Sequence, residues 1–235
     1  AYAHKELAKA YQDLGDYEKA IIRYKLALEI DPQIEDGWVS LANLYTLTGQ
    51  TLKAQQALNK SLQLNPGSAP SHLNMGLNFL KDENYRMALR EFNQAAIMEP
   101  SNELAYFNIG FTYYKMGLQS LDKGGAANEY LRQSNLAYES AYKLRPTYTE
   151  AAFNIGYNYV LLRDSVNAIA WFSKAVESDR GFSRAYFALA QAYQDNNNTT
   201  EAARGFCAFL KNRPSGMTEE ETIAESAVKS LGGCP

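Results

Sequence analysis

The sequence is poor in the residues and motifs that enzymes use for chemistry. Its 235 residues include two histidines, His4 and His72, and no cysteine before Cys207. Neither histidine has the Cys/His/Asp neighbours of a metal site, and no nucleotide-binding or serine-hydrolase motif occurs. We therefore expect a non-enzyme without catalytic residues, metal or cofactor, in which both histidines pack against neighbouring helices.

Basic charge and long apolar runs are also missing. The net charge is −3, whereas binding to nucleic acid or to an anionic membrane surface needs a basic stripe. No run of about 18 apolar residues is present, so no segment is expected to span a bilayer. The hydrophobic content of 46% is nevertheless high enough for a sizeable core. The predicted partner is therefore a protein or peptide.

What the sequence does contain is one pattern that returns every 34 residues. Small residues recur at slots 8 and 20 of the pattern, large ones at slots 4, 7, 11 and 24, and proline at slot 32. In the first copy the matching residues are Leu7, Ala8, Tyr11, Ala20, Tyr24, Ala27 and Pro32. Six copies follow one another over residues 1–34, 35–68, 69–102, 103–148, 149–182 and 183–216. The fourth carries 12 extra residues, which we expect to lengthen both of its helices around a turn at Gly124-Gly125.

This pattern closely resembles that of the tetratricopeptide repeat (TPR) family, W-x2-L-G-x2-Y…A-x3-F…P. The resemblance covers residues 1–216 and implies an all-α fold: a right-handed superhelical α-solenoid of six helix–turn–helix repeats. It also implies that the first helix of each repeat lines a concave peptide-binding face. In size and layout the chain is similar to bacterial envelope lipoproteins that assist type IV pilus or secretin assembly.

Residues 217–235 depart from the repeat and are expected to form a capping helix and tail. Thr218 and Glu221 have the spacing of a capping box. An apolar stripe follows at Ile223, Ala224, Ala227, Val228 and Leu231. A stacked array exposes an unpaired hydrophobic layer at its end, which such a helix covers. No equivalent cap precedes residue 1, so we expect the chain to come from a longer precursor.

The two cysteines, Cys207 and Cys234, flank this predicted cap. One interpretation is a disulfide that fastens the cap to the last repeat, which indicates an oxidising compartment. The other is a buried helical thiol and an unrelated tail thiol. A bridge favours the periplasmic side of the cell envelope, and two free thiols favour the cytoplasm.

The predicted binding surface lies on the first helices of repeats 3–5. Slots 5, 9 and 12 lie near one another on a helix and away from the packing slots. Because these three slots face solvent, polar residues are expected at them. Here they are mostly apolar, and three asparagines recur at slot 6. The predicted peptide-binding residues are Leu73, Asn74, Leu77, Phe107, Asn108, Phe111, Tyr114, Phe153, Asn154, Tyr157 and Phe187. A bounded apolar patch with polar ends is typical of a binding surface.

Two further features bear on the partner. The asparagines Asn74, Asn108 and Asn154 can pair with a peptide backbone, because an amide offers both donors and an acceptor. Family members that bind chaperone C termini use a carboxylate clamp, but beyond Lys5 the corresponding positions here are Lys9, Ser40, Pro70 and Asn74. The sequence therefore lacks the set of residues that forms this carboxylate clamp, and binding of chaperone C termini is not expected. The sequence predicts a non-catalytic adaptor for an apolar peptide or helix; the alternatives are a self-assembling scaffold and the regulatory repeat region of a larger enzyme.

Overall fold

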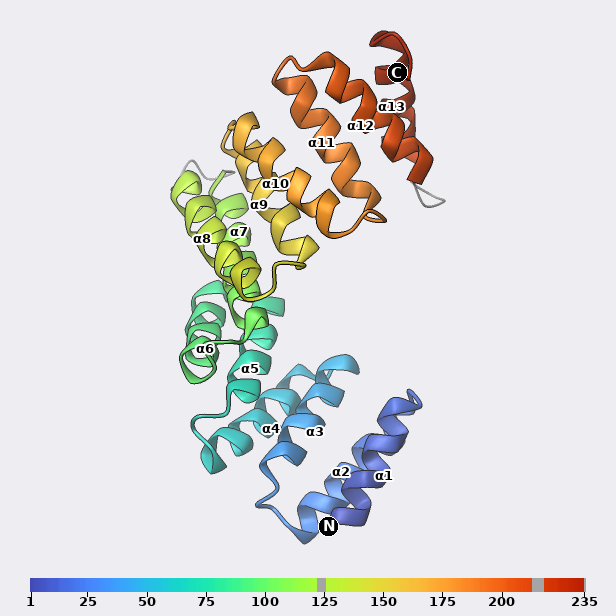
Figure 1. Ribbon diagram of the computed structural model, residues 1–235. Helices are drawn as coiled ribbons and strands as arrows, with labels where there is room; N and C mark the ends of the chain where they lie inside the picture. Colours follow the sequence, from blue (N-terminus) through green and yellow to red (C-terminus); the bar gives the residue numbers. More distant parts are fainter. Residues whose placement is uncertain (122–125, 213–217, 235) are drawn as a thin grey trace. The chain divides into compact units, whose positions relative to one another are not determined.

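The computed structural model describes residues 1–121, 126–212 and 218–234, and every regular element in these ranges is a helix (Figure 1). The all-α helical-repeat solenoid expected from the 34-residue period is confirmed. The helices are α1 (Tyr2–Asp13), α2 (Tyr17–Ile30), α3 (Glu35–Leu47), α4 (Thr51–Leu64), α5 (Ala69–Lys81), α6 (Tyr85–Met98), α7 (Glu103–Leu121), α8 (Ala127–Leu144), α9 (Thr149–Leu161), α10 (Ser165–Ser178), α11 (Ser183–Asp195), α12 (Thr199–Asn212) and α13 (Thr218–Ser230).

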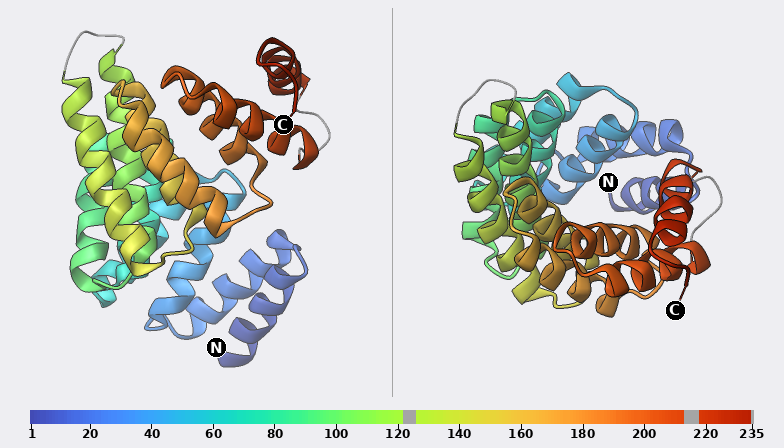
Figure 2. Two further views of the ribbon diagram at one scale, coloured as in Figure 1. Left: turned by 45° about the horizontal axis from the view of Figure 1, so that its top comes forward. Right: turned by 90° about the horizontal axis from the view of Figure 1, so that it is seen from above.

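The helices belong to two compact units, unit 1 (Ala1–Thr112) and unit 2 (Tyr113–Pro235). Within each unit the two helices of a repeat pack together, as α3 does with α4 and α9 with α10 (Figure 2). The second helix of a repeat also packs against the first helix of the next, as α2 does with α3 and α10 with α11. Each repeat is thus supported by its neighbours in the chain, as in other stacked arrays.

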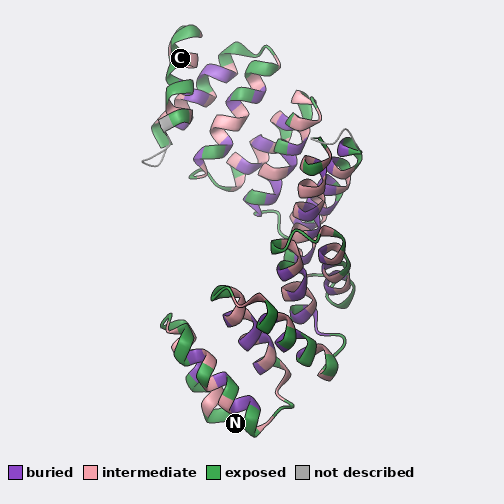
Figure 3. Ribbon diagram, turned by 180° about the vertical axis from the view of Figure 1, so that it is seen from behind, coloured by how far each residue is buried: buried purple, intermediate pink, exposed green. Residues whose placement is uncertain are grey.

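Close approach of the paired helices explains the small residues at slot 8. A Cβ atom on Gly76 would lie 2.5 Å from the ring of Phe92, and one on Gly156 would lie 2.7 Å from the ring of Phe172. Both phenylalanines are fully buried. The buried positions follow the facing sides of the helices (Figure 3). Glycine at slot 8 therefore makes room for phenylalanine at slot 24 in repeats 3 and 5.

The turns inside the repeats share one backbone conformation. Gly15 and Gly49 have φ of +76°, as expected of glycine in these turns. The corresponding turns after α5, α9 and α11 use Glu83, Arg163 and Asn197, whose φ values are 56°, 58° and 60°. These residues occupy the left-handed region, which disfavours side chains with a Cβ. The turn geometry is therefore kept even where glycine is absent.

Proline at slot 32 is not required to end the second helices. Helix α10 ends at Ser178 although the fifth repeat has Arg180 in the proline slot. Instead, the Asp179 side chain accepts a hydrogen bond from the Gly181 backbone N–H at 2.8 Å. Asp31 and Asn65 accept equivalent bonds two residues along the chain. Such Asx turns compete with helical bonding and end the helix.

The extra residues of the fourth repeat lie next to its intra-repeat turn. Helix α7 has 19 residues where α5 and α9 have 13, and α8 has 18 where α6 and α10 have 14. The predicted turn at Gly124-Gly125 lies outside the described residues. So do Pro214, the start of the predicted cap segment at residue 217, and the side chain of Thr218.

Helix α13 covers the last repeat, as the apolar stripe predicts. Ala224 is fully buried, and Ala227, Val228 and Leu231 pack with it against Phe206 and Phe209 of α12. Ile223 is the exception: it is 42% exposed and does not belong to this cluster. A disulfide joins Cys207 of α12 to Cys234, with a Cα–Cα distance of 5.9 Å. Of the two interpretations of the cysteines, the structure shows the bridge.

Candidate functional site

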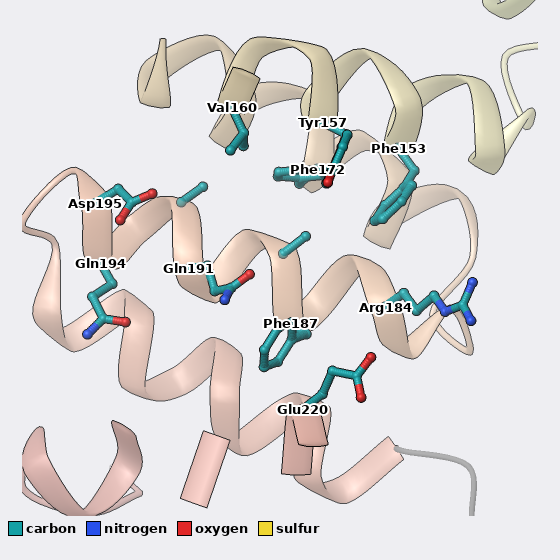
Figure 4. A pocket seen from close by; sticks show the side chains of 12 residues that line it. Phe153, Tyr157, Val160, Phe172, Arg184, Phe187, Gln191, Gln194, Asp195 and Glu220 are labelled. Atoms are coloured by element: carbon teal, nitrogen blue, oxygen red, sulfur yellow. The ribbon is translucent and has the colours of Figure 1, made fainter. Parts of the chain in front are cut away.

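Unit 2 contains a groove between α9 and α11 that encloses about 420 Å³. We call it the unit-2 groove. Helix α9 supplies one wall, α11 the other, and the middle of α10 and the start of α13 contribute one residue each (Figure 4). The lining residues are Phe153, Tyr157, Val160, Phe172, Arg184, Phe187, Ala188, Gln191, Ala192, Gln194, Asp195 and Glu220.

The apolar residues of this groove are of two kinds. Tyr157 and Val160 are 42% and 37% exposed, as expected for slots 9 and 12. Phe153 is half-buried, and its ring lies 5.4 Å from that of Phe172. Phe187 is also half-buried and packs at 5.2 Å against Phe209. The slot-5 phenylalanines are therefore less exposed than predicted, because one side of each ring belongs to the core of its own repeat.

A smaller hollow of about 170 Å³ adjoins the groove. It is lined by Tyr114, Phe153, Asn154 and Tyr157, all of which the sequence selected as binding residues. The rings of Tyr114 and Tyr157 meet edge to face at 6.2 Å. Burial, and to a smaller extent the neighbouring Tyr157, raises the pKa of the Tyr114 hydroxyl above its usual value. The Tyr114 hydroxyl is therefore a neutral hydrogen-bonding group near pH 7.

Charged side chains stand at both ends of the unit-2 groove. Arg184 and Glu220 lie at one end, and Gln194 and Asp195 lie at the other (Figure 4). Neither Arg184 nor Glu220 is among the binding residues predicted from the sequence. Glu220 belongs to the acidic first turn of α13, which alone indicates only favourable interaction with the helix dipole. Its place at the groove depends on how α13 packs on α12, and the sequence spacing contains no signal for that.

The three slot-6 asparagines have different surroundings. The Asn108 side chain donates a hydrogen bond to the Leu104 carbonyl oxygen of its own helix at 2.8 Å. Asn154 lies beside Tyr138, whose pKa is raised by burial, and Asn154 opposes that rise. Asn74 is half-buried on α5. Each amide keeps further hydrogen-bonding capacity, but the three do not form a uniform row of unoccupied groups.

A second set of asparagines, at slot 10, is fully buried. Asn158 donates hydrogen bonds to Ser134 Oγ and Asn135 Oδ1, both at 2.8 Å, and so ties α9 to α8. Asn78 accepts a bond from Thr46 Oγ1 at 3.2 Å and ties α5 to α3. Buried amides need such partners. These residues position the first helices that carry the predicted binding side chains.

The remaining predicted site residues lie in unit 1. Leu73 and Leu77 are on α5, where Leu77 is 37% exposed. Phe107 and Phe111 are half-buried on α7. The role of these four residues as an apolar strip that binds a peptide stays a prediction.

Both histidines lie within the packing of their own repeats. The Nδ1 atom of His72 lies 2.7 Å from Glu91 Oε2, and its Nε2 atom lies 3.1 Å from the Pro66 carbonyl oxygen. His72 thus links α5 to α6, and His4 is half-buried on α1. Among the described residues no group of three or more His, Cys, Asp or Glu side chains could hold a metal ion. None of the helices in these ranges is long and apolar enough to cross a membrane.

Comparison with known proteins agrees with this architecture. A family model described as "Tetratricopeptide repeat" matches residues 1–34, and a second model with the same description matches residues 35–68 and 149–182. The human "Tetratricopeptide repeat protein 6" is 26% identical over 196 residues, which are 73% of this chain and 38% of that protein. The chain thus spans well under half of that relative.

Two solved structures have the same fold. The type IV pilus biogenesis factor PilW superposes with a TM-score of 0.74 at 20% identity, over 94% of this chain and 97% of its own. YrrB, described as a TPR protein with an unusual peptide-binding site, superposes with a TM-score of 0.66 at 19% identity, over 86% of this chain and 97% of its own.

Proposed function

Because this chain is a tetratricopeptide repeat protein, we propose that it is a non-catalytic adaptor that holds an apolar peptide or helix in the unit-2 groove. Proteins built of these repeats serve in protein–protein interaction. The observation that supports the groove as the site is the exposure of Tyr157 and Val160 in the same lining as the half-buried rings of Phe153 and Phe187. Exposed apolar side chains gathered in a concave site are typical of recognition surfaces.

The packing of the groove favours binding of a ligand without rearrangement. Phe153 is held between Phe172 and Phe182, and Phe187 between Phe206 and Phe209. Rings fixed in this way lose little conformational entropy when a partner covers their open sides. Gln191 and Gln194 are exposed on α11 and can pair with the partner's backbone. In this proposal the aromatic rings provide most of the affinity for the peptide, and the glutamine amides fix its orientation in the groove.

The cellular role that we propose is assistance in assembling a cell-envelope complex. The Cys207–Cys234 disulfide supports an oxidising compartment. The superposition with PilW, a pilus biogenesis factor, supports the same setting. The peptide-binding site named for YrrB supports peptide recognition by this fold.

The test uses peptides selected by phage display on the intact chain. We expect apolar sequences to be enriched, and we expect the double variant Tyr157→Ala/Val160→Ala to bind them at least tenfold more weakly. Central apolar side chains contribute about 2 kcal/mol or more each at such interfaces. The matched control is Tyr2→Ala/Leu52→Ala, which removes one aromatic and one aliphatic side chain that are 74% and 76% exposed elsewhere.

The melting temperatures of both double variants should stay near that of the parent protein, because neither removes a buried side chain. Selected peptides that bind the Tyr157→Ala/Val160→Ala variant as tightly as the parent would show that the unit-2 groove is not the binding site.

A further inference from the structure

Unit 1 contains a larger groove that the proposed function does not use. It lies between the second helices α2 and α4, over α3, which packs against both of them. It encloses about 630 Å³, and we call it the unit-1 outer groove. Its lining residues are Lys25, Leu28, Glu29, Trp38, Leu41, Tyr45, Lys53, Gln56, Ala57, Asn59 and Lys60.

The floor of this groove is apolar and firmly held. Leu28, Leu41 and Ala57 are each at most 4% exposed, so they form a closed bottom. Trp38 and Tyr45 are half-buried and rise from the floor on α3. The indole N–H of Trp38 donates a hydrogen bond to the Pro32 carbonyl oxygen at 2.9 Å, which fixes the ring. An adjoining hollow of about 210 Å³ extends the groove past Trp38 along α4.

The rim of the groove is positively charged. The lining contains one carboxylate, Glu29, and three lysines, Lys25, Lys53 and Lys60, although the net charge of the chain is −3. Lys53 donates to Gln50 Oε1 at 2.7 Å and Lys60 to Gln63 Oε1 at 3.3 Å. Both acceptors are neutral amides, so these bonds leave the lysine charge uncompensated.

Two of the other four lysines of unit 1 are paired with carboxylates. Lys5 bonds to Asp36 and Lys19 to Asp16, each at 2.5 Å. In the described part of the chain, the three lysines of the outer groove have no such ion pair. Electrostatic complementarity therefore favours an acidic occupant.

The spacing of the groove residues indicates the form of that occupant. Trp38 and Tyr45 are seven residues apart on α3, and Lys53 and Lys60 are seven apart on α4, which is about 10.5 Å along a helix. Lys53 lies 5.6 Å from the ring centre of Tyr45, and Lys60 lines the hollow beside Trp38. The groove thus has an aromatic–lysine pair at each end and an aliphatic floor between them.

We propose that the unit-1 outer groove binds an acidic amphipathic helix of a partner protein. Glutamates at positions i and i+7 of that helix reach Lys53 and Lys60, because residues seven apart share one helix face. Apolar side chains at i+3 and i+4 lie between them and cover Leu41 and Ala57. Helix-in-groove recognition commonly uses anchors at this spacing. A nucleic acid is disfavoured because Glu29 stands in the lining and the lysines are few.

The test follows Trp38 fluorescence in a Trp171→Phe background, where Trp38 is the single remaining tryptophan. The probe is a synthetic helical peptide with glutamate at i and i+7 and leucine at i+3 and i+4. A matched probe has glutamine in place of both glutamates. We expect the acidic probe to shift Trp38 emission and to bind about tenfold more tightly than the glutamine probe, with an affinity that falls as salt rises.

Two pairs of variants locate the interaction. Lys53→Gln/Lys60→Gln should weaken binding of the acidic probe about tenfold and remove most of its salt dependence. Lys9→Gln/Lys81→Gln removes two exposed lysines outside the groove and should leave binding unchanged. Tyr157→Ala/Val160→Ala should also leave it unchanged, so failure of this proposal and failure of the unit-2 site are distinguishable.

Three results would overturn the proposal. One is an unshifted Trp38 emission at millimolar acidic probe, or equal binding of the two probes. Another is an oligonucleotide that shifts the emission where the acidic probe does not. The third is sedimentation showing a dimer of the free chain that Lys53→Gln/Lys60→Gln dissociates, because a second copy would then occupy the groove.

Discussion

At the scale of single residues, the repeats depend on a size match between slots 8 and 24. Repeat 5 pairs Gly156 with Phe172, whereas repeat 2 pairs Ala42 with Leu58, and all four residues are buried. The two pairs divide a similar space differently between the first and second helix. The choice at either slot is therefore constrained by the residue at the other.

We predict that Gly156→Ala lowers the free energy of unfolding by about 1–3 kcal/mol, because the added methyl group overlaps the buried Phe172 ring. Phe172→Leu should also be destabilising, since it leaves a cavity. Together they recreate the Ala42/Leu58 pair of repeat 2, so the double variant should be more stable than the sum of the two losses implies. Urea denaturation of the four proteins measures this coupling, and strictly additive losses would contradict the size match.

At the scale of elements, the turns between paired helices hold strain that differs from repeat to repeat. Gly15 and Gly49 adopt positive φ without cost, whereas Arg163 adopts nearly the same conformation with a side chain. No heavy atom lies within 4 Å of a Cβ built on Gly15, so space is not the reason for glycine there. The positive φ alone therefore favours glycine at this position of the turn.

We predict opposite effects of two exchanges in these turns. Arg163→Gly should stabilise the protein by about 0.5–1 kcal/mol, because it removes the left-handed strain at one exposed residue. Gly15→Ala should destabilise it by about 1 kcal/mol for the same reason. Thermal denaturation followed by circular dichroism measures both, with Arg163→Ala as the control that keeps the strain. A loss of stability in Arg163→Gly would mean that the arginine side chain makes a larger contribution than the backbone.

At the scale of the whole molecule, stability passes from each repeat to its neighbours, so the end of the array has the least support. Helix α13 packs mainly on α12 and is fastened by the Cys207–Cys234 bridge. It also carries Glu220, one of the charged ends of the unit-2 groove. The state of the cap therefore bears on the shape of the proposed binding site.

We predict that reduction of the disulfide loosens α13 and α12 before any other helix. A bridge that closes a loop of this size contributes about 2–4 kcal/mol. Hydrogen exchange with and without reductant should show faster exchange in these two helices and unchanged exchange in α1–α5. Thiol titration of the denatured, unreduced protein serves as the control, and two reactive thiols would show that the bridge does not form.

Much of the fold could be predicted from the sequence, because repeat packing is local. The 34-residue period places each pair of helices, and the alternation of small and large slots reveals which sides face each other. Slot 9 and slot 12 were predicted to be exposed. In repeat 5 Tyr157 and Val160 are exposed, whereas in repeat 4 Phe111 and Tyr114 are half-buried. These properties depend only on helical periodicity and on contacts between adjacent repeats, which one stretch of sequence contains.

Other features were decided by the tertiary structure, because they depend on side chains that are far apart in the chain. The partial burial of Phe153 and Phe187 follows from the rings of neighbouring helices, which slot analysis does not include. Glu220 reaches the unit-2 groove only through the packing of α13. Pairing of Cys207 with Cys234, and of lysines with aromatic rings in the unit-1 outer groove, requires the distances between helices. Periodicity gives the direction of a side chain on its own helix, whereas the identity of its neighbour is a property of the assembled structure.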